Sequence, residues 1–223
     1  MKRSEINELI RDAKEFFESF QFRLPPWAFW GPDDWKGKGD TEVVRNQLGW
    51  DLTDYGAGEF EKRGLILFTI RNGNLATGHP KTYAEKIMIV RENQICPMHF
   101  HWSKTEDIIN RGGGNLVIDL NGSDEAEEFT GKPLTVSIDG MPRTVEPGGT
   151  VILTPGESIF LEQGMYHRFY GEAGKGKVLV GEVSSVNDDN TDNRFHEPQA
   201  RFPEIDEDEP PLHLLCTDYP EYI

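Results

Sequence analysis

The chain has 223 residues and a formal net charge of −16 at pH 7, from 23 Lys and Arg residues against 39 Asp and Glu residues. This acidic balance opposes binding to nucleic acid or to an anionic membrane surface, and it favours a neutral or cationic small ligand. The sequence has no run of 18 apolar residues and its N-terminus is too charged for a secretory signal, so we expect a cytoplasmic protein without a membrane partner.

The first segment has the period of an amphipathic helix. Apolar residues recur at three- and four-residue steps from Ile6 to Phe20, and Ser4 is available as the N-cap. We expect the Phe-rich face to pack on the outside of a barrel or on a second subunit. Residues 24–40 hold three Trp residues among Pro and Gly, which is typical of an ordered loop. Their rings are expected to fill a core, or alternatively to cap the mouth of a barrel.

From Leu65 onward the pattern changes to that of strands. Short apolar and β-branched runs alternate with turn residues, which is typical of an antiparallel sandwich or barrel. The predicted strands, besides one that carries His99, span residues 65–70, 86–90, 115–120, 134–138, 143–145, 149–153, 158–161, 166–170 and 177–184.

The C-terminal stretch 187–223 is polar and acidic, yet residues such as Phe195 and Leu212 give it apolar anchors. We therefore interpret it as an ordered tail that lies across the barrel. The length is normal for one β-rich domain with additions. We predict a single domain over residues 1–223, with the helix and Trp-rich loop at 1–40, the barrel core at 60–186 and the tail at 187–223.

His99, Phe100 and His101 form the most informative pattern of the chain. In an extended strand, residues i and i+2 point to the same face, so the two imidazoles can bind one ion. Four residues separate His101 from Glu106, which lets the chain turn and bring a carboxylate beside them, and His167 can supply a third imidazole. Three nitrogens and one oxygen suit Mn²⁺, Fe²⁺, Co²⁺, Ni²⁺ or Zn²⁺, and a six-coordinate ion keeps positions open for substrate.

The two cysteine residues are expected to be reduced, and Cys96 is not expected to be a metal ligand. Cys96 and Cys216 are too few for a disulfide framework. Cys96 lies three residues before His99, which on a regular strand places its side chain on the opposite face. The other histidines have no partner at metal-ligand spacing, and we interpret them as structural or surface residues: His79, His196 and His213.

Two sequence blocks resemble the signatures of the cupin superfamily. The first begins at His99 and ends at Gly113, with Asn93 in place of the leading Gly; the second begins at Gly149 and ends at His167. The longer motifs CPMHFHWSKTEDIINRGGGNLVIDL, GMYHRFYGE and NDDNTDNRF narrow the resemblance to the D-lyxose isomerase family of bacterial sugar isomerases, over essentially the whole chain. The resemblance implies an all-β cupin fold, a double-stranded antiparallel β-barrel (jelly roll) with an N-terminal helical extension and an ordered C-terminal tail.

The same resemblance implies an activity, a cofactor and an assembly. Members interconvert D-lyxose with D-xylulose and D-mannose with D-fructose, and they form homodimers. Carried over to this chain, the resemblance makes His99, His101, Glu106 and His167 the ligands of Mn²⁺, and a small monosaccharide the substrate.

Aldose–ketose isomerisation also predicts which other groups the site needs. The reaction moves a proton between C1 and C2 through an enediol, whose negative charge a divalent cation would stabilise. A carboxylate can carry the proton if burial raises its pKa. The candidates are Glu182 on the last strand and Asp188, Asp192 and Glu197 in the tail, and the sequence does not choose among them.

Basic residues near these motifs are candidates for substrate contacts. Lys104, between His101 and Glu106, and Lys86 on a preceding strand could orient or protonate a sugar oxygen. Arg194 and Arg201 interrupt the acidic tail and could bind sugar hydroxyls or pair with nearby carboxylates.

Two other functions stay open at this stage. A cupin dioxygenase would use the same metal with a more aromatic pocket, for which the Trp-rich loop is the available argument. A non-catalytic sugar-binding cupin is the second alternative. Neither the length nor the charge offers the basic DNA-binding helix pair that a regulator would add.

Overall fold

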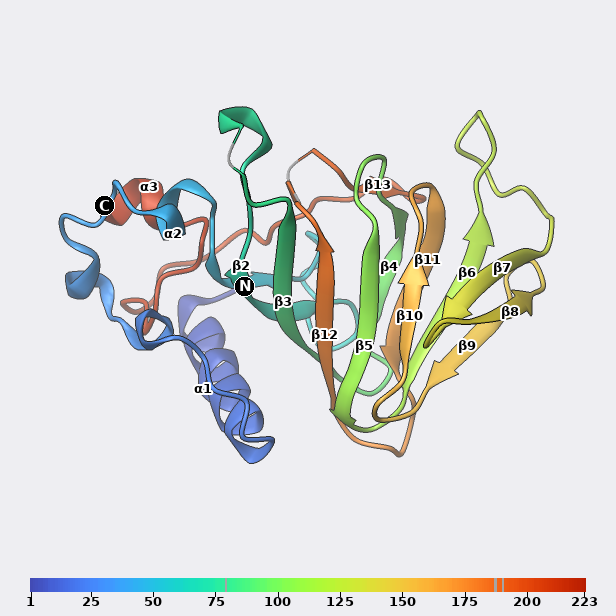
Figure 1. Ribbon diagram of the computed structural model, residues 1–223. Coiled ribbons are helices and arrows are strands. Elements are labelled where there is room, and N and C mark those ends of the chain that lie inside the picture. Colours follow the sequence, from blue (N-terminus) through green and yellow to red (C-terminus); the bar gives the residue numbers. More distant parts are fainter. Residues whose placement is uncertain (79, 187, 190) are drawn as a thin grey trace.

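The computed structural model describes residues 1–78, 80–186, 188–189 and 191–223 as two antiparallel sheets that face each other (Figure 1). Across the larger sheet, the described strands are β1 (Gly49–Thr53), β2 (Leu65–Arg71), β3 (Tyr83–Val90), β12 (Val178–Ser185), β5 (Glu106–Gly113), β10 (Ser158–Leu161), β7 (Leu134–Ile138) and β8 (Met141–Val145). Across the smaller sheet they are β13 (Arg194–Phe195), β4 (Cys96–Phe100), β11 (Met165–Gly171), β6 (Leu116–Gly122) and β9 (Thr150–Leu153).

All but one of the described helical segments precede β1 or follow β13 in the chain. They are α1 (Arg3–Ser19), α2 (Glu42–Arg45) and α3 (Tyr219–Tyr222), with 3-10 turns at Pro26–Phe29, Pro32–Trp35 and Leu75–Thr77. Within the described residues, no helix combines the length and the apolar character needed to cross a membrane.

The main core lies between the two sheets and a second core lies behind the larger one. Alternate residues of β2 enter different cores: Leu65 and Leu67 face the smaller sheet, whereas Ile66 and Phe68 face α1. Because both faces of β2 are covered, its sequence is apolar at nearly every position instead of alternating. The strands predicted at residues 65–70, 86–90, 166–170 and 177–184 are confirmed as β2, β3, β11 and β12, which line the cavity described below.

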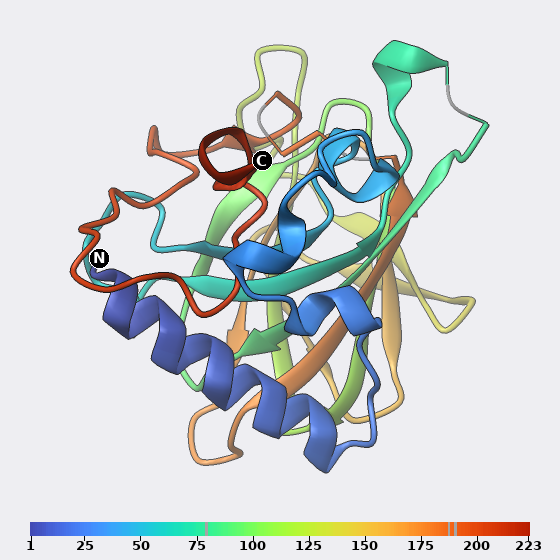
Figure 2. The same cartoon turned by 90° about the vertical axis from the view of Figure 1, so that its left-hand side faces the viewer.

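Helix α1 packs on the outside of the larger sheet, as its apolar stripe predicts (Figure 2). Ile6, Ile10 and Ala13 are fully buried. The predicted N-cap at Ser4 is wrong, because the helix begins earlier, at Arg3. The carboxylate of Glu5 accepts the amide of the residue before the helix, and Asp208 of the tail accepts both the amide and the hydroxyl of Ser4.

The Trp-rich loop fills a small core beside β1 and β2. The Trp35 ring centroid lies 5.0 Å from that of Trp30 and 5.1 Å from that of Tyr219. Trp27 packs on Phe68 with ring centroids 4.9 Å apart. The core-filling interpretation is therefore confirmed, and the alternative of a cap over the barrel mouth is wrong.

Three strands were not predicted from the sequence. The buried positions of β5 are Glu106, Ile108, Asn110 and Gly112, which lack the β-branched run that usually indicates a strand. Strand β1 lies before the expected barrel range of 60–186, and β13 lies within the tail, so the sheets extend beyond that range at both ends. Asn93, at the position of the cupin Gly, has a φ of 55°, a conformation that Asn tolerates better than most residues.

The C-terminal tail runs beside the start of α1 (Figure 2). Arg3 is 1% exposed and donates two 3.0 Å hydrogen bonds to Asp218 and others to Glu207. Asp218 in turn accepts the amide of Leu215. The first turn of the chain and its last residues are thus joined by a buried ion pair.

We expect Arg3→Met to lower the free energy of unfolding by about 3 kcal/mol, because Asp218 would keep a buried charge without its cationic partner. The matched control is Arg23→Met, whose 71% exposed side chain pairs with Glu18 and should change stability by less than about 0.5 kcal/mol. Urea unfolding followed by circular dichroism measures both variants. Equal losses would show that the buried pair has no special role.

Candidate metal centre and active site

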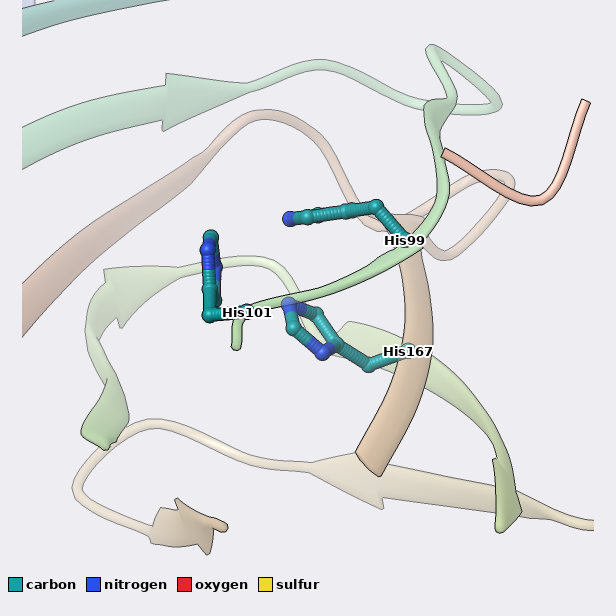
Figure 3. Close-up of side chains that lie close together, drawn as sticks. All are labelled: His99, His101 and His167. Atoms are coloured by element: carbon teal, nitrogen blue, oxygen red, sulfur yellow. The ribbon is translucent and has the colours of Figure 1, made fainter. Parts of the chain in front are cut away.

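Three imidazoles from the smaller sheet converge on one point (Figure 3). Strands β4 and β11 pair with His99 directly opposite His167, and His101 follows the last residue of β4. Their ligand nitrogens all lie within 4.8 Å of one another, and all three side chains are buried. The His-x-His pattern therefore presents both of its imidazoles to the same point, as the strand geometry predicts.

Each imidazole is held by a backbone carbonyl. The Nδ1 atoms lie 2.7 Å from the oxygen of Pro97 for His99, 2.6 Å from that of Asp192 for His101 and 3.0 Å from that of Met165 for His167. A carbonyl oxygen only accepts, so each Nδ1 carries the proton and each Nε2 presents a lone pair to the shared point. Carbonyls of this kind orient the histidine ligands of metals in proteins.

Burial and neighbouring groups keep the rings of His99 and His101 uncharged. Burial, followed by the proximity of His167 and His101, lowers the pKa of His99 well below its ordinary value. Burial and the charge of Lys104 lower the pKa of His101. Neutral imidazoles are the form that binds a metal.

Glu106 reaches the same point from the larger sheet. Its Oε1 lies 3.2 Å from Nε2 of His167 and 3.4 Å from Nε2 of His101. Among the described residues, neither this buried oxygen nor Nε2 of His167 has a hydrogen-bond partner. The Glu106 oxygen and the His167 nitrogen both carry lone pairs and face each other without a proton between them. A cation bound between them would satisfy both atoms. The predicted ligands His99, His101, Glu106 and His167 therefore fit a divalent metal.

Lys104 connects the metal ligands to a second carboxylate. Its buried Nζ donates to Oε2 of Glu106 at 2.6 Å and to Oε1 of Glu182 at 3.1 Å. Burial alone would lower the pKa of Lys104, but the charges of Glu106, Glu182 and Asp189 raise it above the ordinary value. Burial likewise would raise the pKa of Glu106, but Lys104 and His101 hold it well below the usual range. Both groups of the pair are therefore charged.

A second group of charges lines the same cavity. Lys86 lies opposite Glu182 across β3 and β12, with its Nζ 3.6 Å from that carboxylate and 3.2 Å from Asp189. Nη2 of Arg201 lies 2.6 Å from Asp51 and 3.5 Å from Asp189. Within the described chain, the buried Nη1 of Arg201 has no hydrogen-bond partner.

Sequence reasoning missed Asp189 and Asp51. Asp189 is one acid among many in the tail, and nothing local distinguishes it. Asp51 lies on β1, a strand that was not predicted. The charged lining of the cavity, among the described residues, comprises three cations and three carboxylates: Lys86, Lys104, Arg201, Glu106, Glu182 and Asp189.

The other proposed site residues lie elsewhere. Asp188 and Glu197 are exposed. Asp192 is buried, accepts hydrogen bonds from backbone amides and lies outside the cavity lining. Arg194 donates to Glu127 instead of facing the cavity. His79 lies outside the described residues. The two remaining histidines stack on aromatic rings away from the metal ligands: His196 on Phe129 and His213 on Trp50.

The predicted orientation of Cys96 is wrong. On β11, Phe169 follows His167 by two residues, but their partners on β4, Cys96 and His99, are three residues apart, so β4 contains a bulge. The bulge turns Cys96 to the same face as His99, where it lines the cavity and lies 3.0 Å from the hydroxyl of Tyr55. Burial raises the pKa of Cys96 to about 12, so the free sulfur is a thiol. Among the described residues, Cys96 is not part of the group whose ligand atoms converge.

Comparison with known proteins gives the family. A family model described as D-lyxose isomerase matches residues 1–219. Over 228 aligned positions, the chain is 48% identical to a D-lyxose/D-mannose isomerase of Serratia proteamaculans and 50% identical to one of Escherichia coli O157:H7, with 100% of both chains covered in each case.

Solved structures share the fold. An L-ribose isomerase of Cellulomonas parahominis, determined with L-ribose, aligns with a TM-score of 0.62 and 17% identity and covers 92% of this chain and 98% of its own. An L-ribose isomerase of Acinetobacter sp. DL28 aligns with a TM-score of 0.61 and 16% identity over the same shares. The predicted cupin double-stranded β-barrel is confirmed by this likeness and by the two facing antiparallel sheets.

We expect His101→Ala to weaken Mn²⁺ binding by on the order of 100-fold or more, because losing a ligand should cost at least as much as losing the group that orients one. Isothermal titration of the metal-free protein with Mn²⁺ measures the affinity. His196→Ala, in which an imidazole outside the cavity is removed, should bind Mn²⁺ like the unaltered chain. Unchanged affinity in His101→Ala would overturn this ligand assignment.

Proposed function

The chain belongs to the D-lyxose isomerase family, and from this membership we propose that it interconverts D-lyxose with D-xylulose and D-mannose with D-fructose. The observation that carries the proposal is the convergence of three buried imidazoles and Glu106 in one cavity with a further buried carboxylate, Glu182. An aldose–ketose isomerase needs these two parts, a site for a cation and a group that moves a proton.

We propose Mn²⁺ as the physiological ion, with Co²⁺, Fe²⁺, Ni²⁺ or Zn²⁺ as alternatives, held by His99, His101, Glu106 and His167. When bound, a divalent ion supplies Lewis-acid stabilisation of negative charge on the sugar oxygens. The charged lining of the cavity is balanced without an ion, so the added charge would make the cavity net positive. A net positive cavity favours an enediolate over the neutral sugar.

Glu182 is our candidate for the base. It is the one member of the four-carboxylate series, Glu182, Asp188, Asp192 and Glu197, that lines the described cavity. A carboxylate can take a proton from the carbon beside a carbonyl and return it to the neighbouring carbon, so a single group can serve both directions. Hydrogen bonds from Lys104 at 3.1 Å and from the Ser184 hydroxyl at 3.0 Å hold its Oε1 in place.

Cationic side chains would bind the sugar around this carboxylate. Lys104 is protonated, so it can donate a hydrogen bond or supply positive charge but cannot act as a base. Lys86 adds a second ammonium, 3.6 Å from the same Oε1 of Glu182. The Nη1 atom of Arg201 has donors available for a sugar hydroxyl.

The alternatives have less support. The Trp-rich loop was the argument for an aromatic dioxygenase pocket, and its rings pack in a separate core. A non-catalytic sugar-binding protein does not require the buried pair of Lys104 and Glu182. We also propose, from family resemblance alone, that the protein acts as a homodimer, which sedimentation would test. We propose in addition that it is cytoplasmic, as expected from the sequence, which cell fractionation would test.

We expect the protein loaded with Mn²⁺ to convert D-lyxose and D-mannose, EDTA to abolish both activities, and Mn²⁺ or Co²⁺ to restore them best, since six-coordinate ions leave positions for sugar oxygens. Ketose formation is measured by chromatography under anaerobic conditions, because an isomerase consumes no O₂. Full activity after verified metal removal, or dependence on O₂, would contradict the proposal.

We expect isomerisation of D-lyxose in D₂O to place solvent deuterium on carbon. We expect Glu182→Gln to lower turnover at least about 100-fold while Mn²⁺ stays bound, because proton transfer by a positioned group typically accelerates a reaction by about 100-fold or more. Proton NMR of the recovered sugars measures the exchange. Glu197→Gln, at an exposed carboxylate, should behave like the unaltered chain. Turnover without any deuterium incorporation would point to a hydride shift, and normal exchange in Glu182→Gln would place the base elsewhere.

A further inference from the structure

Asp192 binds the loop that carries Lys104. Its Oδ1 accepts the amide of Ser103 at 2.9 Å and the hydroxyl of Ser103 at 3.0 Å, and its Oδ2 accepts the amide of Lys104 at 3.0 Å. The side chain is 7% exposed and is not part of the described cavity lining. Three donors thus occupy the carboxylate, and they hold residues 103 and 104 against the tail.

The main chain of Asp192 also holds a proposed metal ligand. Its carbonyl oxygen lies 2.6 Å from Nδ1 of His101, at a sequence separation of 91 residues. The other two imidazoles obtain their carbonyls locally, from the residue two positions earlier in the same strand: Pro97 for His99 and Met165 for His167.

The difference has a structural reason. His99 and His167 lie within paired strands, where the backbone is fixed by the ladder. His101 follows the end of β4, and its Nδ1 faces a carbonyl of the tail instead of one in its own strand. This acceptor sets which nitrogen of His101 carries the proton and where the ring points.

We propose that Asp192 is a positioning residue through which the C-terminal tail sets both the His101 imidazole and the Lys104 ammonium. The carboxylate of Asp192 fixes the backbone of residues 103 and 104, and this contact in turn places the carbonyl of Asp192 at the His101 imidazole. The inference rests on the proposed function, since it assigns His101 to the metal and Lys104 to the sugar. It also removes Asp192 from the candidates for the base, because both of its carboxylate oxygens already accept hydrogen bonds and it lies outside the cavity lining.

The test compares Asp192→Asn with Asp139→Asn. Asp139 makes the same type of contact far from the cavity, since its Oδ1 accepts the amide of Ser158 at 3.0 Å and its hydroxyl at 2.8 Å. Asp192 accepts with both oxygens, so Asp192→Asn turns one acceptor into a donor and must lose a contact. In Asp139→Asn the remaining oxygen can keep both contacts, so this variant controls for the loss of a negative charge. Mn²⁺ affinity is measured by isothermal titration without sugar, and kcat and KM are measured with D-lyxose.

We expect Asp192→Asn to weaken Mn²⁺ binding and to lower kcat, each by about 10- to 100-fold, with a much smaller change in KM, because groups that orient metal ligands typically have effects of this size. Asp139→Asn should retain both properties. Ser103→Ala, which removes only the hydroxyl donor, should show a smaller loss in the same direction and serves if Asp192→Asn does not fold.

Three results would overturn the inference. Unchanged Mn²⁺ affinity and kcat in Asp192→Asn would remove the positioning role, and equal losses in Asp139→Asn would reduce it to general stability. If Asp192→Asn loses deuterium exchange but keeps its Mn²⁺ affinity, Asp192 would be the base. If the unaltered chain binds Mn²⁺ but isomerises no sugar, the proposed function fails, while the affinity comparison still decides the role of Asp192.

Discussion

The site depends on one buried carboxylate with two different partners. Oε1 of Glu106 faces His101 and His167, and Oε2 accepts the ammonium of Lys104. A carboxylate that is 3% exposed is costly to keep charged unless it is paired, and Lys104 supplies that pairing. Glu106 begins a strand of the larger sheet, whereas the imidazoles come from the smaller sheet. The same carboxylate therefore joins the two halves of the barrel at the point where the metal ligands meet.

Lys104 extends this constraint to the proposed chemistry. Its ammonium is shared between a proposed metal ligand, Glu106, and the proposed base, Glu182. A shift of Lys104 would therefore change the charge around both groups at once. Because Lys104 contacts both carboxylates, the backbone of its loop between His101 and Glu106 must be fixed, although this loop contains no regular secondary structure.

The ends of the chain support the site from outside the barrel. The tail supplies Asp189 and Arg201 to the cavity wall and Asp192 to the 103–104 backbone. Further along, the same tail is joined to the first turn of α1 by the buried contacts of Arg3 with Asp218. The helix that covers the outer face of the larger sheet thus also anchors the segment that closes the cavity.

Local patterns in the sequence were sufficient for the helix, most strands and the shared face of His99 and His101. The three-to-four-residue period of α1 and the same-face positions of His99 and His101 follow from backbone geometry within a few residues. The choice of Glu182 among four carboxylates, the position of Asp192 and the turned side chain of Cys96 came only from the tertiary structure. These depend on a strand bulge and on contacts such as that between Lys104 and Glu182, which lie 78 residues apart. A periodic sequence pattern predicts which face of a strand or helix a side chain occupies, but the packing of distant segments determines which residues that side chain contacts.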